Sequence, residues 1–358
     1  MKIAFIVRST LFTARGGDTI QVQETASSLR EAGIEVDIKL ASESIAYAAY
    51  NGLHFFNITR PADILLHIRR SNKPFVVSTI LINYALYDKH YRRGLAGKVL
   101  SIFSAPGIEY AKALYRFVTG RDKLVSIAYL WKGQQGSIKE VLRKTSAVLV
   151  QATEEYDDLV KLYGMRPAHY IVHNGINEYL FQHHKTVVRK KNLVLCVARI
   201  EGIKNQYNLV RALNDTGYQL ILIGDAAPGQ QAYYKQCKAI AASNISFIDH
   251  LPQHELTAYY ASATVHVLPS WFEVCGLSTL EAAAMGCRVV ITGHGYAPSY
   301  FGEDAFYCDP EDPESILKAV EKAMAKDDDN RLQQKVLQNY SWKKTAADTL
   351  AVYKTVFD

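Results

Sequence analysis

Residues 193–225 read LVLCVARIEGIKNQYNLVRALNDTGYQLILIGD, and this stretch decides the class of fold. Its two apolar runs, LVLCVAR and QLILIGD, have the length and composition of buried strands. Between them, a stretch that begins near Tyr207 is typical of a helix. A strand, a helix and a second strand in this order make the crossover unit of a parallel sheet. The sequence therefore predicts an α/β protein.

The same alternation continues on both sides of this stretch. Further strands are predicted at IAFIVR, VDIKLA, ADILLHI, PFVVSTI and SAVLVQA in the first half, and at ISFIDH, ATVHVLPS and CRVVITG in the second. The polar, basic run HHKTVVRKKN separates the two halves. We therefore expect two doubly wound domains, residues 1–178 and 179–342, which bind ligands beyond the carboxyl ends of their strands, in a cleft between the domains.

Composition excludes several classes of protein. The chain has 358 residues, of which 49% are hydrophobic and 21% charged, an ordinary balance for a globular protein. No apolar run approaches the roughly 20 residues that cross a bilayer, and the N-terminus lacks the features of a signal peptide. The five cysteines are widely spaced and form no CxxC, so neither a zinc site nor a disulfide framework is expected. These features predict a cytoplasmic protein.

Positive charge is concentrated in the first half. Residues 60–144 hold 16 Lys and Arg against 5 Asp and Glu, an excess of 11, whereas the whole chain carries +6. Within residues 84–132 the basic residues alternate with aromatic ones. Such a surface attracts anions such as phosphates or acidic lipid headgroups. A solvated face that covers buried aromatic residues accounts for the same pattern, and both interpretations stay open.

Residues 269–286, PSWFEVCGLSTLEAAAMG, lead from the end of a strand into a helix expected to begin near Ser278. A helix start presents N–H groups and positive potential, which can hold phosphate or sugar oxygens. Gly276 allows a ligand to approach the backbone closely, and Glu273 can accept hydrogen bonds from sugar hydroxyls. Glu281 can do the same for a ribose diol. Ser278 and Glu281 also have the spacing of a capping box, which alone would account for Glu281.

Two cations follow the first strand of the opening stretch. Arg199 ends this strand, and Lys204 lies five residues further along. Two positive charges at the carboxyl end of a strand can neutralise a diphosphate as it leaves, although two solvated surface charges give the same sequence. Gly16 and Gly17 precede a helix expected at 19–31, and they suit close approach of the backbone to a phosphate. The GxGxxG fingerprint of dinucleotide-binding domains is absent.

Taken in order, these segments resemble the retaining GT-B glycosyltransferases of family 4, over almost the whole chain. The motifs that carry the resemblance are the Gly16-Gly17 loop, NGI at 174–176, R-x4-K-N at 199–205, E-x7-E at 273–281 and Ser341-Trp342. The resemblance implies two Rossmann-like domains that face each other across a cleft. The C-terminal domain would bind the nucleotide sugar and the N-terminal domain the acceptor. The last helix, 343–358, would pack back on the N-terminal domain.

The resemblance also implies a role for each of these residues. Arg199 and Lys204 would bind the donor diphosphate and stabilise it as leaving group, so that no divalent metal or other cofactor is needed. Glu273 would hold the hydroxyls of the donor sugar, and Glu281 the ribose. Further donor contacts are implied at Gly16, Gly17, Gly224, Ile248, Cys275, Gly276 and Leu277. Such enzymes keep the anomeric configuration of the sugar.

One departure from the family concerns the acceptor side. Many relatives carry a histidine shortly after the strand PFVVSTI, where this chain has Leu81. Asp18, Asn83 and Tyr84 are the residues expected to take over at this place. The aromatic and basic segment 84–132 indicates a glycan or polyprenyl-linked acceptor. It also indicates a peripheral association with the inner, anionic face of a membrane.

The activity predicted in this way is the transfer of a hexose-type sugar from a UDP- or GDP-type donor, in the assembly of a surface polysaccharide or glycolipid. A nucleotide-binding oxidoreductase would show the same alternation of strands and helices, but it would leave E-x7-E unexplained. A non-catalytic subunit that binds nucleotide sugars is a second alternative. A nucleic-acid-binding module would explain the basic segment and leave the second half without a role, so no nucleic-acid partner is expected.

Overall fold

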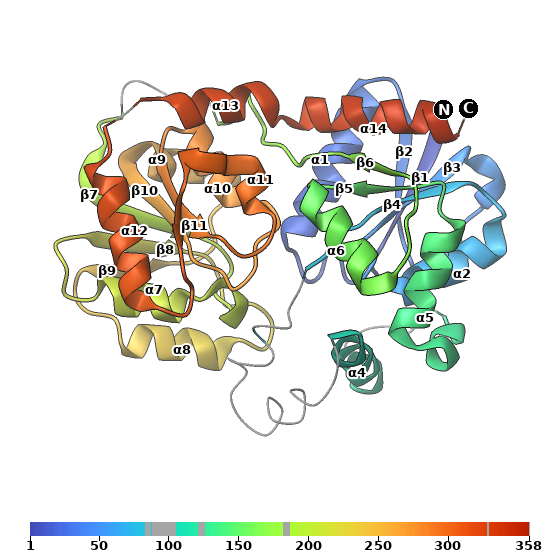
Figure 1. The fold of residues 1–358 in the computed structure, drawn as a ribbon, viewed down its shortest axis with the longest axis horizontal. Helices are drawn as coiled ribbons and strands as arrows, with labels where there is room; N and C mark the ends of the chain where they lie inside the picture. Colours follow the sequence, from blue (N-terminus) through green and yellow to red (C-terminus); the bar gives the residue numbers. More distant parts are fainter. Residues whose placement is uncertain (83–86, 88–104, 121–125, 182–186, 328, 358) are drawn as a thin grey trace. The chain divides into compact units, whose positions relative to one another are not determined.

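The computed structural model of the protein describes residues 1–82, 87, 105–120, 126–181, 187–327 and 329–357. The chain divides into two compact units, residues 1–174 with 342–358, and residues 175–341. Each unit holds one six-stranded parallel sheet with helices packed against it (Figure 1). The domain boundary predicted from the sequence lies between residues 178 and 179, a few residues after the division between the units.

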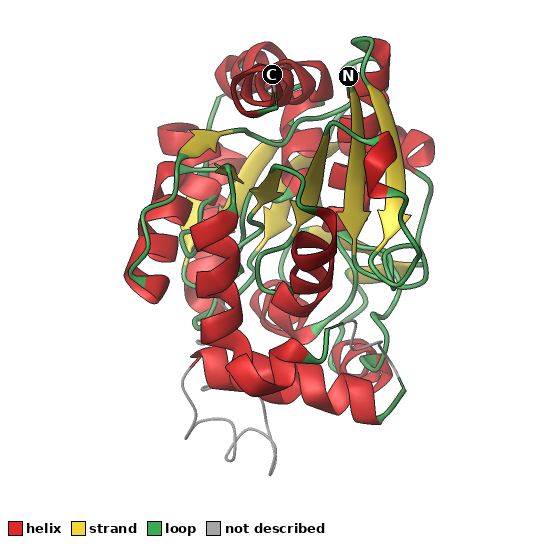
Figure 2. Cartoon of the chain, turned by 90° about the vertical axis from the view of Figure 1, so that its right-hand side faces the viewer, coloured by secondary structure: helices red, strands yellow, loops and turns green. Residues whose placement is uncertain are grey.

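The sheet of the first unit has the strand order β2-β1-β3-β4-β5-β6, and all neighbouring strands are parallel. Its strands are β1 (Lys2–Val7), β2 (Glu35–Leu40), β3 (Gly52–Phe56), β4 (Phe75–Ser78), β5 (Ala147–Val150) and β6 (His169–Ile171). Its helices are α1 (Gly17–Glu31), α2 (Pro61–Ser71), α4 (Ala105–Val118), α5 (Ala128–Lys144), α6 (Thr153–Tyr163) and α14 (Trp342–Val356). Figure 2 views this sheet with helices on either side of the strands.

Two apolar clusters form the core of the first unit. One contains buried side chains of α2, α5 and α6, and the other contains those of α1 and α14, so these helices cover opposite faces of the sheet. The last helix is fixed to the sheet by His54 of β3, whose Nδ1 lies 2.6 Å from the hydroxyl of Tyr353 and whose Nε2 lies 2.8 Å from Ser78 Oγ. Burial lowers the pKa of His54 to about 3, so this imidazole is neutral.

One of the predicted strands is wrong. The run ADILLHI lies inside helix α2. The strand in this part of the chain is β3, formed by the preceding segment GLHFF. Pro61 occupies the first turn of α2, where the missing N–H has no helical partner. Ile64, Leu65 and Ile68 share the buried face, which is the spacing of an amphipathic helix. A short apolar run does not by itself separate a strand from such a helix.

The sheet of the second unit has the order β12-β11-β10-β7-β8-β9 and is also parallel. Its strands are β7 (Lys190–Val197), β8 (Gln219–Ile223), β9 (Ile245–Ile248), β10 (Ala263–Leu268), β11 (Arg288–Thr292) and β12 (Phe306–Cys308). Its helices are α7 (Gln206–Leu213), α8 (Gln231–Ala239), α9 (Gln253–Ser262), α10 (Leu277–Ala284), α11 (Ala297–Phe301), α12 (Pro313–Ala325) and α13 (Arg331–Asn339). Residues 193–225 form the predicted strand–helix–strand unit: α7 connects β7 to β8, and these two strands pair in parallel.

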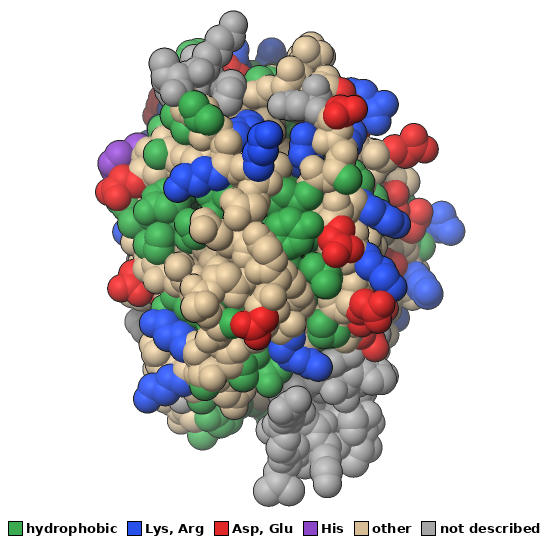
Figure 3. All heavy atoms as spheres, turned by 90° about the vertical axis from the view of Figure 1, so that its left-hand side faces the viewer, with side chains coloured by type: hydrophobic (Ala, Val, Ile, Leu, Met, Phe, Trp, Pro, Cys, Tyr) green, Lys and Arg blue, Asp and Glu red, His purple; other side chains and the backbone are tan. Residues whose placement is uncertain are grey.

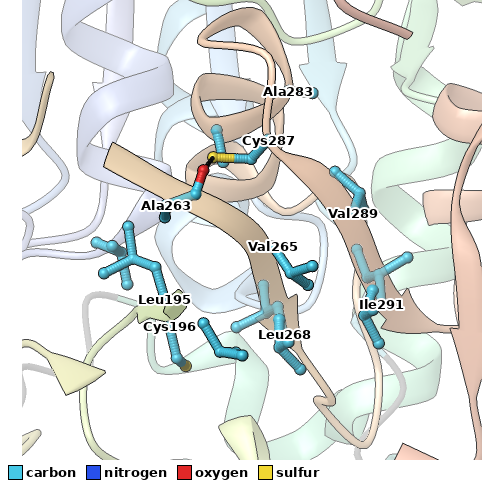
Figure 4. Packing of buried hydrophobic residues seen from close by; sticks show 14 of the residues in the cluster. Leu195, Cys196, Ala263, Val265, Leu268, Ala283, Cys287, Val289 and Ile291 are labelled. Atoms are coloured by element: carbon cyan, nitrogen blue, oxygen red, sulfur yellow. Dashed lines mark hydrogen bonds between the residues drawn. The ribbon is translucent and has the colours of Figure 1, made fainter. Parts of the chain in front are cut away.

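The cysteine side chains are part of the apolar core. All five are free and buried. Figure 4 shows Cys196 and Cys287 among aliphatic side chains such as Leu195, Val265 and Val289. Burial raises the pKa of Cys196 to about 12 and that of Cys287 to about 11. These two thiols are therefore protonated at neutral pH and are poor nucleophiles.

In the part of the chain that the structure describes, no helix is long and apolar enough to cross a membrane.

The face of the molecule in Figure 3 carries Lys and Arg side chains interspersed with Asp and Glu. This mixture of signs on one face contrasts with the excess of positive charge in residues 60–144.

Candidate functional site

The candidate site lies at the carboxyl edge of the second sheet, beyond β7 and β10. These two strands are neighbours, and the chain continues from β7 to one side of the sheet and from β10 to the other. In open α/β sheets, ligands bind where the strand order reverses in this way. Three residues predicted from the sequence follow these two strands: Arg199 and Lys204 after β7, and Glu273 after β10. The topology thus brings the predicted phosphate-binding and sugar-binding residues to one place.

Side-chain amides fix the loop that carries the two cations. Asn205, in a left-handed conformation with φ of 60°, donates hydrogen bonds to the carbonyl oxygens of Pro269 at 3.1 Å and Pro310 at 2.8 Å. Gln206 donates to the carbonyl oxygen of Arg199 at 2.8 Å. These bonds connect the β7 loop with the ends of β10 and β12, so the side-chain amides hold the backbone at Lys204 in place relative to the β10 loop.

Lys204 and Glu273 form an ion pair across 69 residues of sequence. The ammonium group of Lys204 lies 3.1 Å from Glu273 Oε1 and 2.8 Å from Oε2. The side chain of Glu273 is 9% exposed and that of Lys204 is 23% exposed, so solvent screens this pair less than a pair on the surface. Arg199 is different: its side chain is 42% exposed and pairs with Glu201 at 2.8 Å.

Gly224 directly follows β8, and Ile248 is the last residue of the neighbouring strand β9. The N–H of Gly224 donates to the carbonyl oxygen of Ile248 at 3.0 Å, so these two predicted donor contacts lie side by side. Gly224 has a φ of 146°, and a Cβ at this position would lie 2.1 Å from the carbonyl oxygen of Ala198. The close approach of the β7 loop therefore requires glycine here, whether or not a ligand is bound.

Gly295, in the loop after β11, was not among the predicted site residues. The N–H of Glu273 donates to the carbonyl oxygen of His294 at 3.0 Å, and the N–H of Tyr296 donates to that of Glu273 at 2.8 Å. Gly295 has a φ of 105°, and a Cβ on it would lie 2.2 Å from the carbonyl oxygen of Glu273. The two glycines in GHGY, directly after a predicted strand, were the signal that could have revealed this contact.

The capping-box interpretation of Glu281 is wrong. Helix α10 begins at Leu277, with Gly276 as its cap at φ of 66°, so Ser278 is the second residue of the helix and does not cap it. A carboxylate at Glu281 lies too far into the helix to reach the cap position. Cys275, Gly276 and Leu277, which the resemblance assigns to donor binding, are the residues at the start of this helix.

Helix α9 holds the carboxylate of Glu281. Gln253 Nε2 donates to one carboxylate oxygen at 2.8 Å, and the hydroxyl of Tyr260 donates to the other at 2.9 Å. Burial and the neighbouring carboxylate raise the pKa of Tyr260 well above its usual value, so this phenol remains a donor. Glu281 is thus oriented by side chains from another helix, and neither Gln253 nor Tyr260 stands in a pattern that the sequence analysis could recognise.

In the first unit, Gly16 and Gly17 mark the start of α1, as predicted. Asp18 is not available as an isolated carboxylate, because Arg8 holds both of its oxygens at 2.6 and 3.0 Å. The same guanidinium donates to the carbonyl oxygen of Ala14 at 2.7 Å and so closes the loop between β1 and α1. Arg8 was not recognised as a site residue, although it directly follows a buried strand.

Of the other residues predicted on the acceptor side, Asn83 and Tyr84 lie outside the described residues. Leu81, which stands where many relatives carry a histidine, is 3% exposed and packs in the apolar core. Within the described residues, no group of three or more His, Cys, Asp and Glu side chains could hold a metal ion.

Two doubly wound parallel sheets of six strands are the architecture of the GT-B fold, and solved structures confirm this class. Sucrose-phosphate synthase from Thermosynechococcus elongatus superposes with a TM-score of 0.76 at 16% sequence identity, over 99% of this chain and 98% of that one. HepE of Anabaena, in complex with UDP and glucose, gives a TM-score of 0.70 at 16% identity, over 99% and 100% of the two chains. The predicted fold class is therefore correct.

Residues 180–340, nearly all of the second unit, match the model of the family Glycosyl transferases group 1. A curated relative, MMP alpha-(1->4)-mannosyltransferase of Mycolicibacterium hassiacum, is 26% identical over 240 residues. The match takes in 63% of this chain and 57% of that protein, so the chain spans less than two thirds of the relative's length.

Proposed function

We propose that this protein is a glycosyltransferase that moves a hexose-type sugar from a nucleotide-diphosphate donor to a glycan or lipid-linked acceptor. The observation that carries the proposal is the Lys204–Glu273 pair at the switch point of a group 1 glycosyltransferase unit. An ammonium group can neutralise the diphosphate of such a donor. A carboxylate beside it can accept hydrogen bonds from the sugar hydroxyls, so the pair matches adjoining parts of one molecule.

The proposed chemistry needs no metal ion. When the bond between sugar and diphosphate breaks, negative charge develops on the departing oxygen, and a fixed cation lowers the barrier by stabilising it. Lys204 is held in place by its pair with Glu273, and the more exposed Arg199 on the same loop adds a second positive charge. With R-x4-K and E-x7-E in this arrangement, we place the enzyme among the retaining glycosyltransferases of family 4.

The donor side of the proposal extends to the nucleoside. Glu281, with its oxygens aligned by Gln253 and Tyr260, is the proposed ligand of the ribose hydroxyls. The backbone at Ile248 and Gly224 would contact the base. The fold is shared with HepE, whose structure contains UDP and glucose, and the sequence is similar to that of a mannosyltransferase. These likenesses favour a UDP- or GDP-hexose and a role in surface polysaccharide or glycolipid assembly.

A hydrolysis screen of nucleotide sugars tests this proposal. The purified protein is incubated with UDP-, GDP- and ADP-sugars in EDTA, and the nucleoside diphosphate released is measured. We expect release from one UDP- or GDP-hexose, at a rate that added Mg²⁺ or Mn²⁺ does not change. Release that appears only with added metal would contradict the metal-independent chemistry. Thermal stabilisation by NADH and not by UDP or GDP would favour an oxidoreductase instead.

We further propose that the first unit associates with an anionic membrane surface on its cytoplasmic side. Half of the exposed large hydrophobic side chains among the described residues lie within residues 115–131. They stand at the end of α4 and the start of α5, and they are Tyr115, Phe117, Val118, Ile127, Leu130 and Trp131. The two helices are joined by a hydrogen bond of 3.0 Å from the hydroxyl of Tyr110 to the carbonyl oxygen of Leu130. We call these six side chains the 115–131 surface.

Charge and apolar exposure together support this partner. The 115–131 surface lies within the segment 60–144, which has an excess of 11 positive charges. Apolar side chains that enter the interface and basic side chains that attract lipid phosphates are the two contributions that bind a peripheral protein to an anionic bilayer.

Trp131 provides a direct measurement of this association. Its side chain is exposed, whereas Trp271 and Trp342, the other two tryptophans, are buried. We expect anionic vesicles at low salt to shift the emission of Trp131 to shorter wavelength and to sediment the protein. Burial of an apolar side chain is worth roughly 1.5–3 kcal/mol, so Trp131→Ser with Ile127→Ser should weaken binding at least about tenfold.

A matched control comes from the second unit. Val188 is 85% exposed, as is Trp131, but it lies outside the 115–131 surface. Val188→Ser should leave vesicle binding unchanged. If the wild-type protein fails to sediment with anionic vesicles at low salt, or if Val188→Ser weakens binding as much as the double variant, the proposed membrane surface is wrong.

A further inference from the structure

Four polar side chains are buried together where strands β4 and β5 of the first unit end. Thr79 follows β4, Gln151 follows β5, Glu155 lies in the first turn of α6, and Gln21 belongs to α1. All four are at most 6% exposed, and Glu155 is fully buried. A buried carboxylate is costly unless its oxygens are hydrogen-bonded, so its partners indicate what the group stabilises.

Glu155 accepts three hydrogen bonds from two different strand ends. Its Oε1 accepts from the hydroxyl of Thr79 at 2.5 Å and from the N–H of Leu81 at 2.8 Å. Its Oε2 accepts from the N–H of Gln151 at 2.6 Å. Burial raises the pKa of Glu155, while these hydrogen bonds oppose the rise. The N–H groups of Leu81 and Gln151 can only donate, so each of the two carboxylate oxygens accepts a hydrogen bond from the backbone.

The structural role of a carboxylate in the first turn of a helix accounts for only one of these oxygens. The bond from Gln151 to Oε2 satisfies an N–H just before α6, as a capping glutamate does. Oε1 points to the other strand and holds residues on both sides of Ile80. Glu155 therefore acts on the turn after β4 as well as on its own helix.

Ile80 is strained. It has a φ of 44°, in the left-handed region, and it is buried. This conformation is an outlier for a β-branched residue, so it persists only where the surroundings determine it. Besides Glu155, the N–H of Thr79 donates to the carbonyl oxygen of Leu149 at 3.0 Å, and the N–H of Ile58 donates to that of Thr79 at 2.9 Å.

We infer that Glu155 is a positioning residue that holds the turn at residues 79–81 in its strained form and thereby sets the acceptor edge of the first sheet. The inference rests on the proposed function, together with the role in acceptor binding that the family resemblance implies for the N-terminal domain. The same network reaches helix α1, because Gln151 Nε2 lies 3.5 Å from Gln21 Oε1, one turn after the Gly16-Gly17 loop. Gln151 thus connects the two sides: its backbone N–H binds Glu155, and its side chain contacts Gln21 of α1.

Glu155→Gln tests this inference, because the variant keeps the size of the side chain and replaces one carboxylate oxygen by an NH2 group. The NH2 group of the glutamine then faces a backbone N–H, that of Leu81 or that of Gln151, and cannot accept a hydrogen bond from it. The turn can therefore relax. A displacement of about 1 Å at a reacting group can cost on the order of 10²-fold in rate. We expect transfer to the acceptor to fall by this order while the KM for the donor and the slow hydrolysis of the donor change less than about twofold.

A second variant covers the case in which Glu155→Gln does not fold. Thr79→Val removes one of the donors to Oε1 with little change of shape, and it should shift the ratio of transfer to hydrolysis in the same direction but by less. Glu140→Gln is the matched control. Glu140 is also a buried carboxylate, bound by Arg69, but it lies near the end of α5 that leads to the amino end of β5. This control should lower stability and leave the ratio unchanged.

The outcomes separate the inference from the proposed function. If the wild-type protein turns over no nucleotide sugar, the proposed function fails. If the wild-type protein is active, and a folded Glu155→Gln variant has the wild-type ratio of transfer to hydrolysis, the positioning role is wrong. The same conclusion holds if Glu140→Gln shifts this ratio as strongly, since the effect would then follow from lower stability alone.

Discussion

Lys204→Ala is expected to lower the rate of nucleoside diphosphate release about 10²- to 10³-fold, the effect of removing one preorganised charge from a developing anion. The ammonium of Lys204 is held at 2.8 Å from Glu273, so it is in place before the donor binds and needs little rearrangement in the reaction. The substitution also leaves the largely buried carboxylate of Glu273 without this partner, next to a diphosphate of the same sign. Both effects act in the same direction.

The measurement is the turnover of the best donor from the nucleotide-sugar screen, together with the thermal unfolding of each variant. Arg199→Ala is expected to have an effect of the same order if the exposed guanidinium turns towards the diphosphate. Lys318→Ala is the control, because Lys318 also pairs with a glutamate, Glu314 at 2.7 Å, but on the exposed surface of α12. Turnover within a fewfold of wild type in a folded Lys204→Ala variant would refute the proposed role of this residue.

The sequence was sufficient to predict most of the second unit, because its central strands β10 and β11 and the second half of β7 are buried and therefore appear as continuous apolar runs. The same property explains the failure at ADILLHI, where a helix packed against the sheet buries a run of similar length. Lys204 and Glu273 were predicted as separate motifs. Their ion pair could not be, because it depends on the adjacency of β7 and β10, which the order of the strands along the chain does not show.

The residues that sequence reasoning missed share one physical property: their function depends on neighbours that are distant in sequence. Arg8 acquires its role from the loop that it closes, and Glu155 from the strand end that it faces. The spacing of Ser278 and Glu281 suggested a capping box. However, Gly276, with its positive φ, is the cap of α10, so the helix begins earlier than predicted. The carboxylate of Glu281 is instead bound by Gln253 of α9. Local patterns identify which side chains are unusual, and tertiary contacts decide what they do.

Gly295→Ala is expected to destabilise the second unit and to inactivate the enzyme together. The added Cβ would lie 2.2 Å from the carbonyl oxygen of Glu273, and the φ of 105° is disfavoured for any residue with a side chain. The loop after β11 must then move, which breaks its two backbone hydrogen bonds to Glu273. Strained backbone and overpacking each cost roughly 1–3 kcal/mol, so the free energy of unfolding should fall by roughly 2–6 kcal/mol.

The consequence for turnover distinguishes a positioning role of this loop from a merely structural one. Glu273 has its backbone bonded to residues 294 and 296 and its side chain bonded to Lys204, so a shift of the loop should separate the carboxylate from the ammonium. Gly293→Ala is the control two residues earlier, because no atom lies within 4 Å of a Cβ there and its φ is outside the left-handed region. This variant should keep wild-type stability and turnover. If Gly295→Ala loses stability but its folded fraction turns over the donor normally, the close approach at Gly295 stabilises the fold without placing Glu273.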